Sequence, residues 1–83
     1  MSEPTVNITV LVEQTVKALV SAPDQVFVTP VDEDGETVLE LEVAEEDMGK
    51  IIGRQGRTVR ALRTLVAAVG VRMHKRFGLE ILE

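Results

Sequence analysis

Residues 49–63, GKIIGRQGRTVRALR, decide the fold, because two glycines interrupt a segment that otherwise has the composition of a helix. Only Arg54 and Gln55 separate Gly53 from Gly56, and glycine adopts the left-handed backbone of a sharp reversal at little cost. The stretch therefore predicts two helices joined by a tight turn. From Arg54 onward an arginine occupies every third position to the end of the stretch, so the second helix carries a row of positive charge.

This turn has the properties of an anion-binding site. Gly56 stands where the second helix begins, although serine, threonine, asparagine or aspartate would cap that helix better. Arg57 lies in its first turn, where positive charge opposes the helix dipole by roughly 0.3–1 kcal/mol. Bare backbone, arginine side chains and the positive end of a helix together attract an anion such as phosphate. Because the chain has neither a Walker loop nor a Rossmann fingerprint, we expect a nucleic-acid backbone rather than a nucleotide.

The charge of the chain is divided unevenly. Its 83 residues carry a formal net charge of −5. Residues 1–49 hold twelve acidic residues and one lysine, a net charge of −11, whereas residues 50–83 hold eight basic and two acidic residues, a net charge of +6. Since the Debye length at physiological salt is only about 8 Å, the local basic cluster matters more than the total for a polyanionic partner.

Composition restricts the possible classes of protein. With 45% apolar and 28% charged residues, the chain is typical of a soluble globular protein, and its length predicts a single domain over 1–83. It has no cysteine, no apolar run of about 20 residues and no basic leader, so we expect a cytoplasmic protein. His74 is the single histidine, and no nucleophile–base set is apparent. We therefore expect no enzyme, no metal site and no cofactor.

Hydrophobic periodicity predicts an α+β fold with the element order α-β-β-α-α-β. Pro30 cannot donate a ladder hydrogen bond, so the first strand is expected at a sheet edge. The second and last strands are joined by two helices and can lie parallel, which gives a three-stranded mixed sheet packed on one face by three helices. The expected elements are a helix at 7–21, a strand at 25–31, a turn at 32–36, a strand at 37–44, helices at 45–52 and 57–69, a basic loop at 70–76 and a strand at 77–83.

The apolar residues of each element predict the core. In the strand at 37–44, Leu39, Leu41 and Val43 alternate with glutamates and should point inward. The first helix, capped by Asn7, should bury Val12, Val16 and Leu19. The residues of the long basic helix expected to face the core are Val59, Leu62, Leu65, Val66 and Val69.

The segment IIGRQGRTV at 51–59 resembles the core motif of the KH domain, I/V-I-G-x-x-G-x-x-I/V, with Val59 at the last apolar position. The element order resembles the type II form of that fold, and nearly the whole chain is similar to small bacterial single-KH-domain proteins of the KhpA family. The resemblance implies binding of single-stranded RNA, with the GxxG loop clamping the backbone of about four nucleotides. The RNA-binding residues that it implies are Lys50, Ile51, Ile52, Gly53, Arg54, Gln55, Gly56, Arg57 and Arg60.

The same resemblance implies how bases are held. Ile51, Ile52 and the edge of the Leu39–Val43 strand would form an apolar groove, with one of the two isoleucines available to the ligand. Phe27 and Phe77 are the only aromatic residues, so we do not expect an aromatic stacking platform. The resemblance also suggests an RNA chaperone or regulator linked to growth and division.

Three other interpretations of the basic helix stay open. The arginines could form a solvated surface with no partner. The helix pair could be a helix-turn-helix for duplex DNA, although the two glycines and the surrounding strands argue against it. The helix could also bind protein, because Ala61, Ala67 and Ala68 leave a smooth patch for a homodimer or for a heterodimer with a second KH-domain protein.

Overall fold

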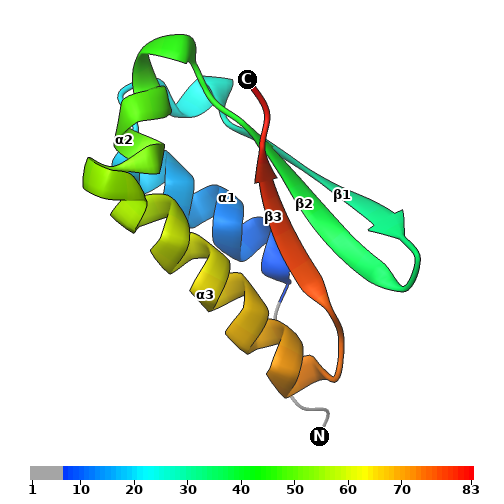
Figure 1. Cartoon of the computed structure of the whole chain (residues 1–83). Helices are drawn as coiled ribbons and strands as arrows, with labels where there is room; N and C mark the ends of the chain where they lie inside the picture. The colour runs from blue at the N-terminus through cyan, green and yellow to red at the C-terminus, as the bar shows by residue number, and fades with distance from the viewer. Residues whose placement is uncertain (1–6) are drawn as a thin grey trace, which may run out of the picture.

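A computed structural model describes residues 7–83, and within them it shows three α-helices and a three-stranded sheet (Figure 1). The strands lie in the order β1-β2-β3, with β1 antiparallel and β3 parallel to the central β2. The predicted element order and mixed sheet are therefore confirmed. The bounds are α1 Ile8–Leu19, β1 Phe27–Glu33, β2 Glu36–Glu42, α2 Met48–Ile52, α3 Arg57–Met73 and β3 Phe77–Ile81, with short 3-10 turns at Pro23–Gln25, Glu45–Asp47 and Arg54–Gly56.

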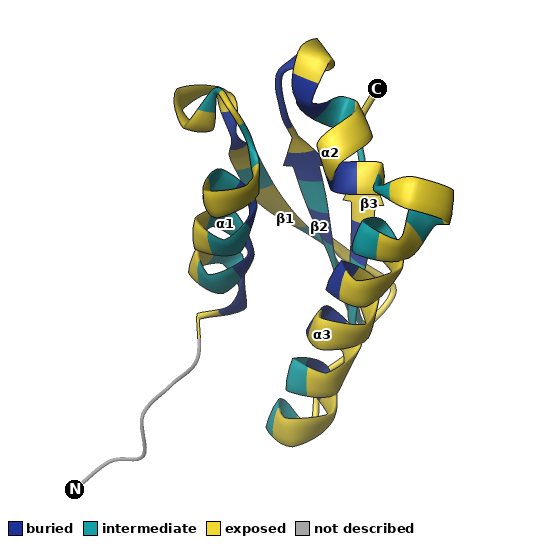
Figure 2. Ribbon diagram, turned by 90° about the vertical axis from the view of Figure 1, so that its left-hand side faces the viewer, coloured by how far each residue is buried: buried dark blue, intermediate teal, exposed yellow. Residues whose placement is uncertain are grey.

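The core lies between the helices and one face of the sheet. Figure 2 shows α1 and α3 on the same side of the strands, with their buried residues turned toward them. Leu39 and Leu41 of β2 have no exposed surface, and neither has Val12 of α1 or Val66 of α3. This confirms the alternation predicted for β2. Within residues 7–83, every helix falls short of the length and hydropathy that a bilayer crossing requires.

The β1–β2 hairpin follows its predicted turn chemistry. Asp34 and Gly35 both have left-handed backbones, with φ of 47° and 82°, as a two-residue hairpin turn requires. Pro30 lies on β1, which is an edge strand of the described sheet, opposite Leu39 of β2. The missing N–H of the proline therefore costs no ladder hydrogen bond.

Helix α1 begins at its predicted cap, but one residue that was expected in the core is exposed. The side chain of Asn7 caps it by accepting the backbone N–H three residues on, at 3.2 Å. Its buried stripe runs at four-residue spacing through Ile8, Val12 and Val16. Leu19 is 43% exposed, so the prediction that it faces the core is wrong. The three-residue step from Val16 places it at the edge of the stripe, and the helix ends there.

Helix α3 also keeps a four-residue spacing on its buried side. Leu62, Val66 and Gly70 are its buried residues. Leu65 is 38% exposed, which corrects the prediction that it belongs to the core. Val69 is partly buried and packs against the core beside them, Val59 is also partly buried, and α3 lies against β3.

The loop predicted at 70–76 is shorter, because α3 continues to Met73. Gly70 lies inside the helix rather than after it, and its carbonyl accepts the N–H of Lys75 at 2.8 Å. A Cβ at position 70 would lie 2.6 Å from the carbonyl oxygen of Lys75. The glycine thus leaves room for the chain to return across the end of α3, and left-handed His74 caps the helix.

Candidate nucleic-acid interface

The loop between α2 and α3 is a sharp reversal held by its own backbone hydrogen bonds. Helix α2 ends at Gly53, whose N–H donates to the carbonyl of Gly49 at 2.9 Å. The N–H of Gly56 then donates to the carbonyl of Gly53 at 3.1 Å, and that of Arg57 to the carbonyl of Arg54. Gly53 is thus the C-cap of α2, and the tight turn predicted between the two helices is confirmed.

Gly53 and Gly56 are required for different reasons, although both have positive φ, 75° and 73°. A Cβ on Gly53 would collide with the side chain of Thr58 and lie 2.9 Å from its backbone nitrogen, so packing itself demands glycine there. A Cβ on Gly56 would meet only Nη2 of Arg60, at 3.8 Å. Position 56 is therefore open on its outer side, as a surface that a ligand approaches would be.

Gln55 adopts a left-handed backbone although it carries a side chain. Its φ and ψ are 57° and 26°, which costs a non-glycine residue roughly 1–2 kcal/mol. A residue persists in such a conformation only where its surroundings hold it. The carbonyl of Gln55 accepts a hydrogen bond from Nη2 of Arg60 at 2.9 Å, and the left-handed Gly56 follows it.

Two backbone N–H groups of this loop remain free. No acceptor in residues 7–83 contacts the backbone nitrogen of Arg54 or of Gln55, and both residues are exposed. They lie just ahead of α3, whose N-cap Gly56 supplies no side-chain acceptor. Free amides beside an uncovered helix N-terminus are the arrangement that binds phosphate oxygens in proteins.

The arginines around the loop fall into two groups. Arg54 and Arg57 are exposed, and neither forms an ion pair with any residue in the described part of the chain. Arg60 turns back onto the loop, and Nε of Arg63 donates to the carbonyl of Leu79 in β3 at 3.4 Å. The four arginines were expected to be equivalent cations. Instead, two guanidinium groups are unpaired and the next two bind backbone carbonyls.

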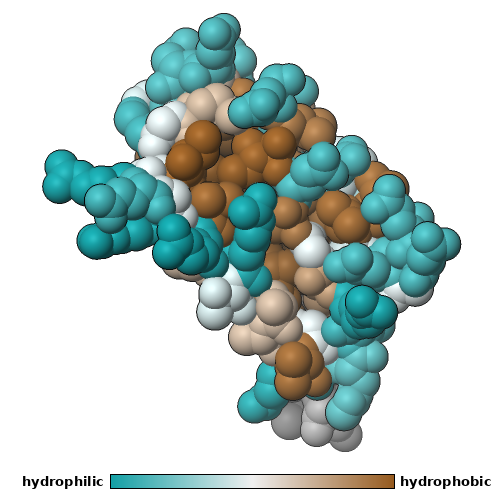
Figure 3. Space-filling view, viewed as in Figure 1, coloured by the Kyte–Doolittle hydropathy of each residue, from teal (hydrophilic) through white to brown (hydrophobic). Residues whose placement is uncertain are grey.

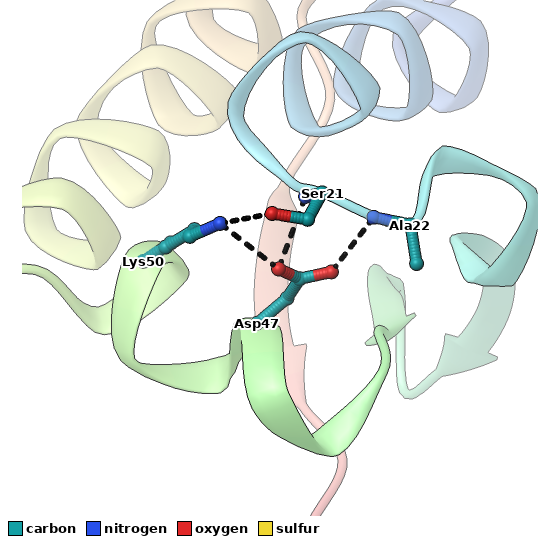
Figure 4. A network of polar contacts seen from close by, with 4 residues as sticks. All are labelled: Ser21, Ala22, Asp47 and Lys50. Carbon is teal, nitrogen blue, oxygen red and sulfur yellow. Dashed lines mark hydrogen bonds and ion pairs between the residues drawn. The ribbon is translucent and has the colours of Figure 1, made fainter.

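Lys50, which is itself exposed, belongs to a network around the buried carboxylate of Asp47 (Figure 4). The carboxylate of Asp47 has no exposed surface and accepts two backbone N–H groups at 3.0 Å, that of Ser21 on Oδ1 and that of Ala22 on Oδ2. Nζ of Lys50 lies 3.4 Å from Oδ1 of Asp47 and donates to Oγ of Ser21. The network joins the chain after α1 to the start of α2.

This environment holds the pKa of Asp47 below its ordinary value. The N–H of Ser21 contributes most, and the N–H of Ala22 and the ammonium of Lys50 act in the same direction, whereas burial opposes them by raising the pKa. In the sequence Asp47 is only the last of three consecutive acids at the start of the helix predicted at 45–52. No local pattern signals its role, because its backbone partners lie in a distant part of the chain.

A hollow of about 530 Å³ opens beside α2. Figure 3 shows apolar surface gathered between α2 and the C-terminal end of β3, with hydrophilic side chains around it. Ile52 is 39% exposed at its wall, whereas Ile51 is fully buried and supports the wall from within the core. The residues that line the hollow are Gln25, Phe27, Glu42, Val43, Ala44, Glu45, Met48, Ile52, Leu82 and Glu83.

One part of the predicted groove is corrected by the sheet. Strand β2 is central and pairs along both edges, so the Leu39–Val43 segment has no free edge to offer a ligand. Val43 and Ala44 contribute instead where the chain leaves the end of β2. The predicted sheet already implies this, because an edge position for the first strand and a parallel pairing of the second with the last leave the second strand between two neighbours.

A mixed three-stranded sheet covered by three helices, with a GxxG loop between the second and third helices, defines a KH domain of type II. Residues 9–81 match the family model described as "KhpA/KhpB, KH domain". The chain therefore belongs to the KhpA/KhpB family of KH-domain proteins. The resemblance seen in the sequence is confirmed.

Relatives in other bacteria match along most of their length. The RNA-binding protein KhpA of Clostridium acetobutylicum is 47% identical over 72 residues, which cover 87% of this chain and 96% of that protein. The RNA-binding protein KhpA of Aquifex aeolicus is 48% identical over 73 residues, 88% of this chain and 92% of that protein.

Solved structures of Era share the fold. A crystal structure of Aquifex aeolicus Era bound to GDP and aluminium fluoride superposes with a TM-score of 0.61 at 16% identity, over 98% of this chain and 35% of the Era chain. A structure of Era in complex with MgGDPNP and nucleotides 1506–1542 of 16S ribosomal RNA gives the same TM-score, identity and coverage. At this identity the likeness establishes the type of fold.

Proposed function

We propose that this protein binds single-stranded RNA and that the GxxG loop holds the RNA backbone. The observation that carries the proposal is the pair of free N–H groups at Arg54 and Gln55, exposed ahead of α3 and flanked by the unpaired guanidinium groups of Arg54 and Arg57. The relatives that match nearly their whole length are RNA-binding proteins, which supports the same assignment.

The groove beside α2 holds the bases. Five of its ten lining residues are aliphatic or methionine and one is aromatic, Phe27, which is 56% exposed, while the other four are polar and include three glutamates. Bases reach such a groove only when they are unpaired, so the ligand is single-stranded. Ile52 connects the two parts of the site, because it lies both at the groove wall and immediately before the loop.

Acidic residues lie on both sides of the molecule. Glu40 alternates with the buried Leu39 and Leu41, so it repels a polyanion from the sheet face opposite the helices, whereas Glu42 lines the groove, where uncharged bases and not phosphates would lie. Lys50 also contributes positive charge, which is partly neutralised because its ammonium is paired with Asp47. With about two to four phosphates neutralised, the slope of log K against log salt should be about −1.5 to −3, from roughly −0.7 for each phosphate.

The decisive experiment replaces Arg54 and Gln55 together by aspartate. We expect RNA affinity to fall by more than about tenfold, because two carboxylates then stand beside the free backbone N–H groups in place of a guanidinium and a neutral side chain. Circular dichroism should be unchanged, since both side chains are exposed. The matched control, Arg72→Asp with His74→Asp, makes the same change in charge at the far end of α3 and should bind almost normally. Retained binding by the loop variant would place the site elsewhere.

A second function is association with another protein. Leu65 and Val71 of α3 are 38% and 75% exposed, and Ala61 and Ala68 lie one turn away from Leu65 on either side. This surface fits a second copy of the chain or another KH-domain protein. Sedimentation across a range of concentrations, with Leu65→Asp as the disrupting variant, tests it.

We place the protein in the cytoplasm as an RNA chaperone or regulator.

Duplex DNA is the rival ligand for the same helices. The described α2 has only five residues, and α3 lies against β3, so neither helix projects as a recognition helix does. Titration of the same fluorescent sequence as single-stranded RNA and as duplex DNA decides between them. Tighter binding of the duplex would overturn the assignment to RNA.

A further inference from the structure

We propose that Arg60 is a positioning residue, which holds the GxxG loop in its binding conformation through the carbonyl of Gln55 instead of contacting a phosphate itself. This role rests on the RNA-binding function proposed above and defines how the same site is kept ready. The sequence places Arg60 in a row of RNA-contacting cations, but its guanidinium has a partner inside the protein.

The contact is short and charge-assisted. Nη2 of Arg60 lies 2.9 Å from the carbonyl oxygen of Gln55, five residues earlier. Hydrogen bonds from a guanidinium are stronger than those between neutral groups. The same Nη2 lies 3.8 Å from the position that a Cβ on Gly56 would take, so the guanidinium lies beside Gly56 as well as Gln55.

Arg60 holds the second polar end of one peptide unit in the loop. The unit between Gln55 and Gly56 contains the carbonyl bound by Arg60 and the N–H that donates to the carbonyl of Gly53 at 3.1 Å. Both polar ends of this peptide plane are therefore held. Because the residues on either side of it are left-handed, the plane would rotate toward a commoner conformation if one end were released.

That rotation would affect the ligand directly. The free N–H groups of Arg54 and Gln55 immediately precede this peptide unit, and their direction depends on the backbone angles of Gln55. Preorganised donors bind an anion more tightly than donors that must first be ordered. Arg57, one turn earlier and exposed, has no side-chain hydrogen bond within residues 7–83 and is the matched cation that acts by charge alone.

The first test uses the free protein. In Arg60→Ala, NMR order parameters of residues 54–56 should fall from about 0.85 toward 0.6, and the amide of Gly56 should exchange faster. Arg57→Ala should leave both unchanged. These measurements need no RNA, so they remain decisive for the role of Arg60 even if the chain does not bind RNA. An unaltered loop in Arg60→Ala would overturn the proposal.

The second test compares the two arginines in RNA binding. Arg57→Ala should reduce the salt slope by about 0.7, the value for one phosphate. Arg60→Ala should lower affinity by about fivefold or more while leaving the slope close to that of the wild type. An equal loss of slope in both variants would show that Arg60 contacts a phosphate and would refute the positioning role.

A second-site change completes the design. Asparagine enters the left-handed region more readily than glutamine, so Gln55→Asn in the Arg60→Ala background should recover at least half of the lost binding free energy. It should recover none in the Arg57→Ala background. Failure to recover binding in the Arg60→Ala background would contradict the proposal, because a loop that needs only to be held in shape is rescued by a residue that prefers that shape.

Discussion

The carboxylate of Asp47, which has no exposed surface, accepts the backbone N–H of Ser21 at 3.0 Å across 26 residues of sequence. Its second oxygen accepts the N–H of Ala22 at the same distance. Asp47 directly precedes α2, and α2 ends at the GxxG loop. One buried side chain thus sets where the short helix, and with it the loop, lies relative to α1.

We predict that Asp47→Ala strongly destabilises the protein. The substitution removes a fully buried carboxylate and leaves the part-buried N–H groups of Ser21 and Ala22 without their acceptor. The melting temperature should fall by at least about 10 °C for a chain of this size, as followed by circular dichroism. Asp24→Ala serves as the control, since that exposed aspartate has no side-chain hydrogen bond in the described residues, and it should change little. Equal melting temperatures for the two variants would contradict the anchoring role.

The lowered pKa of Asp47 predicts how stability depends on pH. A group whose folded pKa lies below its unfolded pKa stabilises the fold at pH values above the unfolded pKa, and this contribution is lost as the pH falls toward the folded value. For Asp47 the loss begins below about pH 4. The contribution should be constant between pH 5 and pH 8.

The comparison with Asp47→Asn isolates this effect from the other carboxylates. Asparagine has nearly the same shape but carries no charge at any pH. The difference in melting temperature between wild type and Asp47→Asn should be constant above pH 5 and should shrink as the pH falls to 3. A difference that grows on acidification would mean that the pKa of Asp47 is raised and would reverse the assignment.

Much of the site could be predicted because it depends on patterns of residues that are close together in the sequence. The pair Gly53 and Gly56, separated by two residues, indicates a reversal between helices, and alternation around Leu39 and Leu41 indicates the buried strand. The anchor at Asp47 and the loop contact of Arg60 were not predictable. Each depends on where a side chain turns in three dimensions, and neither leaves a pattern in neighbouring residues.

The misassigned residues have a physical reason in common. Leu19 and Leu65 have the hydrophobicity of core residues but lie at the edge of stripes that keep a four-residue spacing. Gly70 falls in the loop predicted at 70–76, but it lies inside α3. Its actual constraint comes from Lys75, which packs back against it. The type of a residue predicts whether it tends to be buried or to end a helix, whereas the neighbours that the fold brings to it determine its actual environment.

Three Gly→Ala variants should separate the demands made on the glycines near the loop. Gly49→Ala should stabilise by up to about 1 kcal/mol, because this helical position has free space around it. Gly56→Ala should cost about 1–2 kcal/mol, for its positive φ alone. Gly53→Ala should cost more than Gly56→Ala, since it combines positive φ with a collision against Thr58. Urea unfolding measures all three, and a Gly56→Ala variant less stable than Gly53→Ala would contradict the described packing.

The apolar groove gives the last prediction. Ile52→Ala should reduce RNA affinity by about 1–2 kcal/mol, because it removes aliphatic surface that a base would cover. It should leave the salt slope unchanged, since no charge is lost. Val10→Ala, on α1 and 49% exposed, removes apolar surface outside the groove and should bind normally. A loss of affinity with altered slope, or an equal loss in both variants, would show that Ile52 acts through the loop or the fold instead of through the bases.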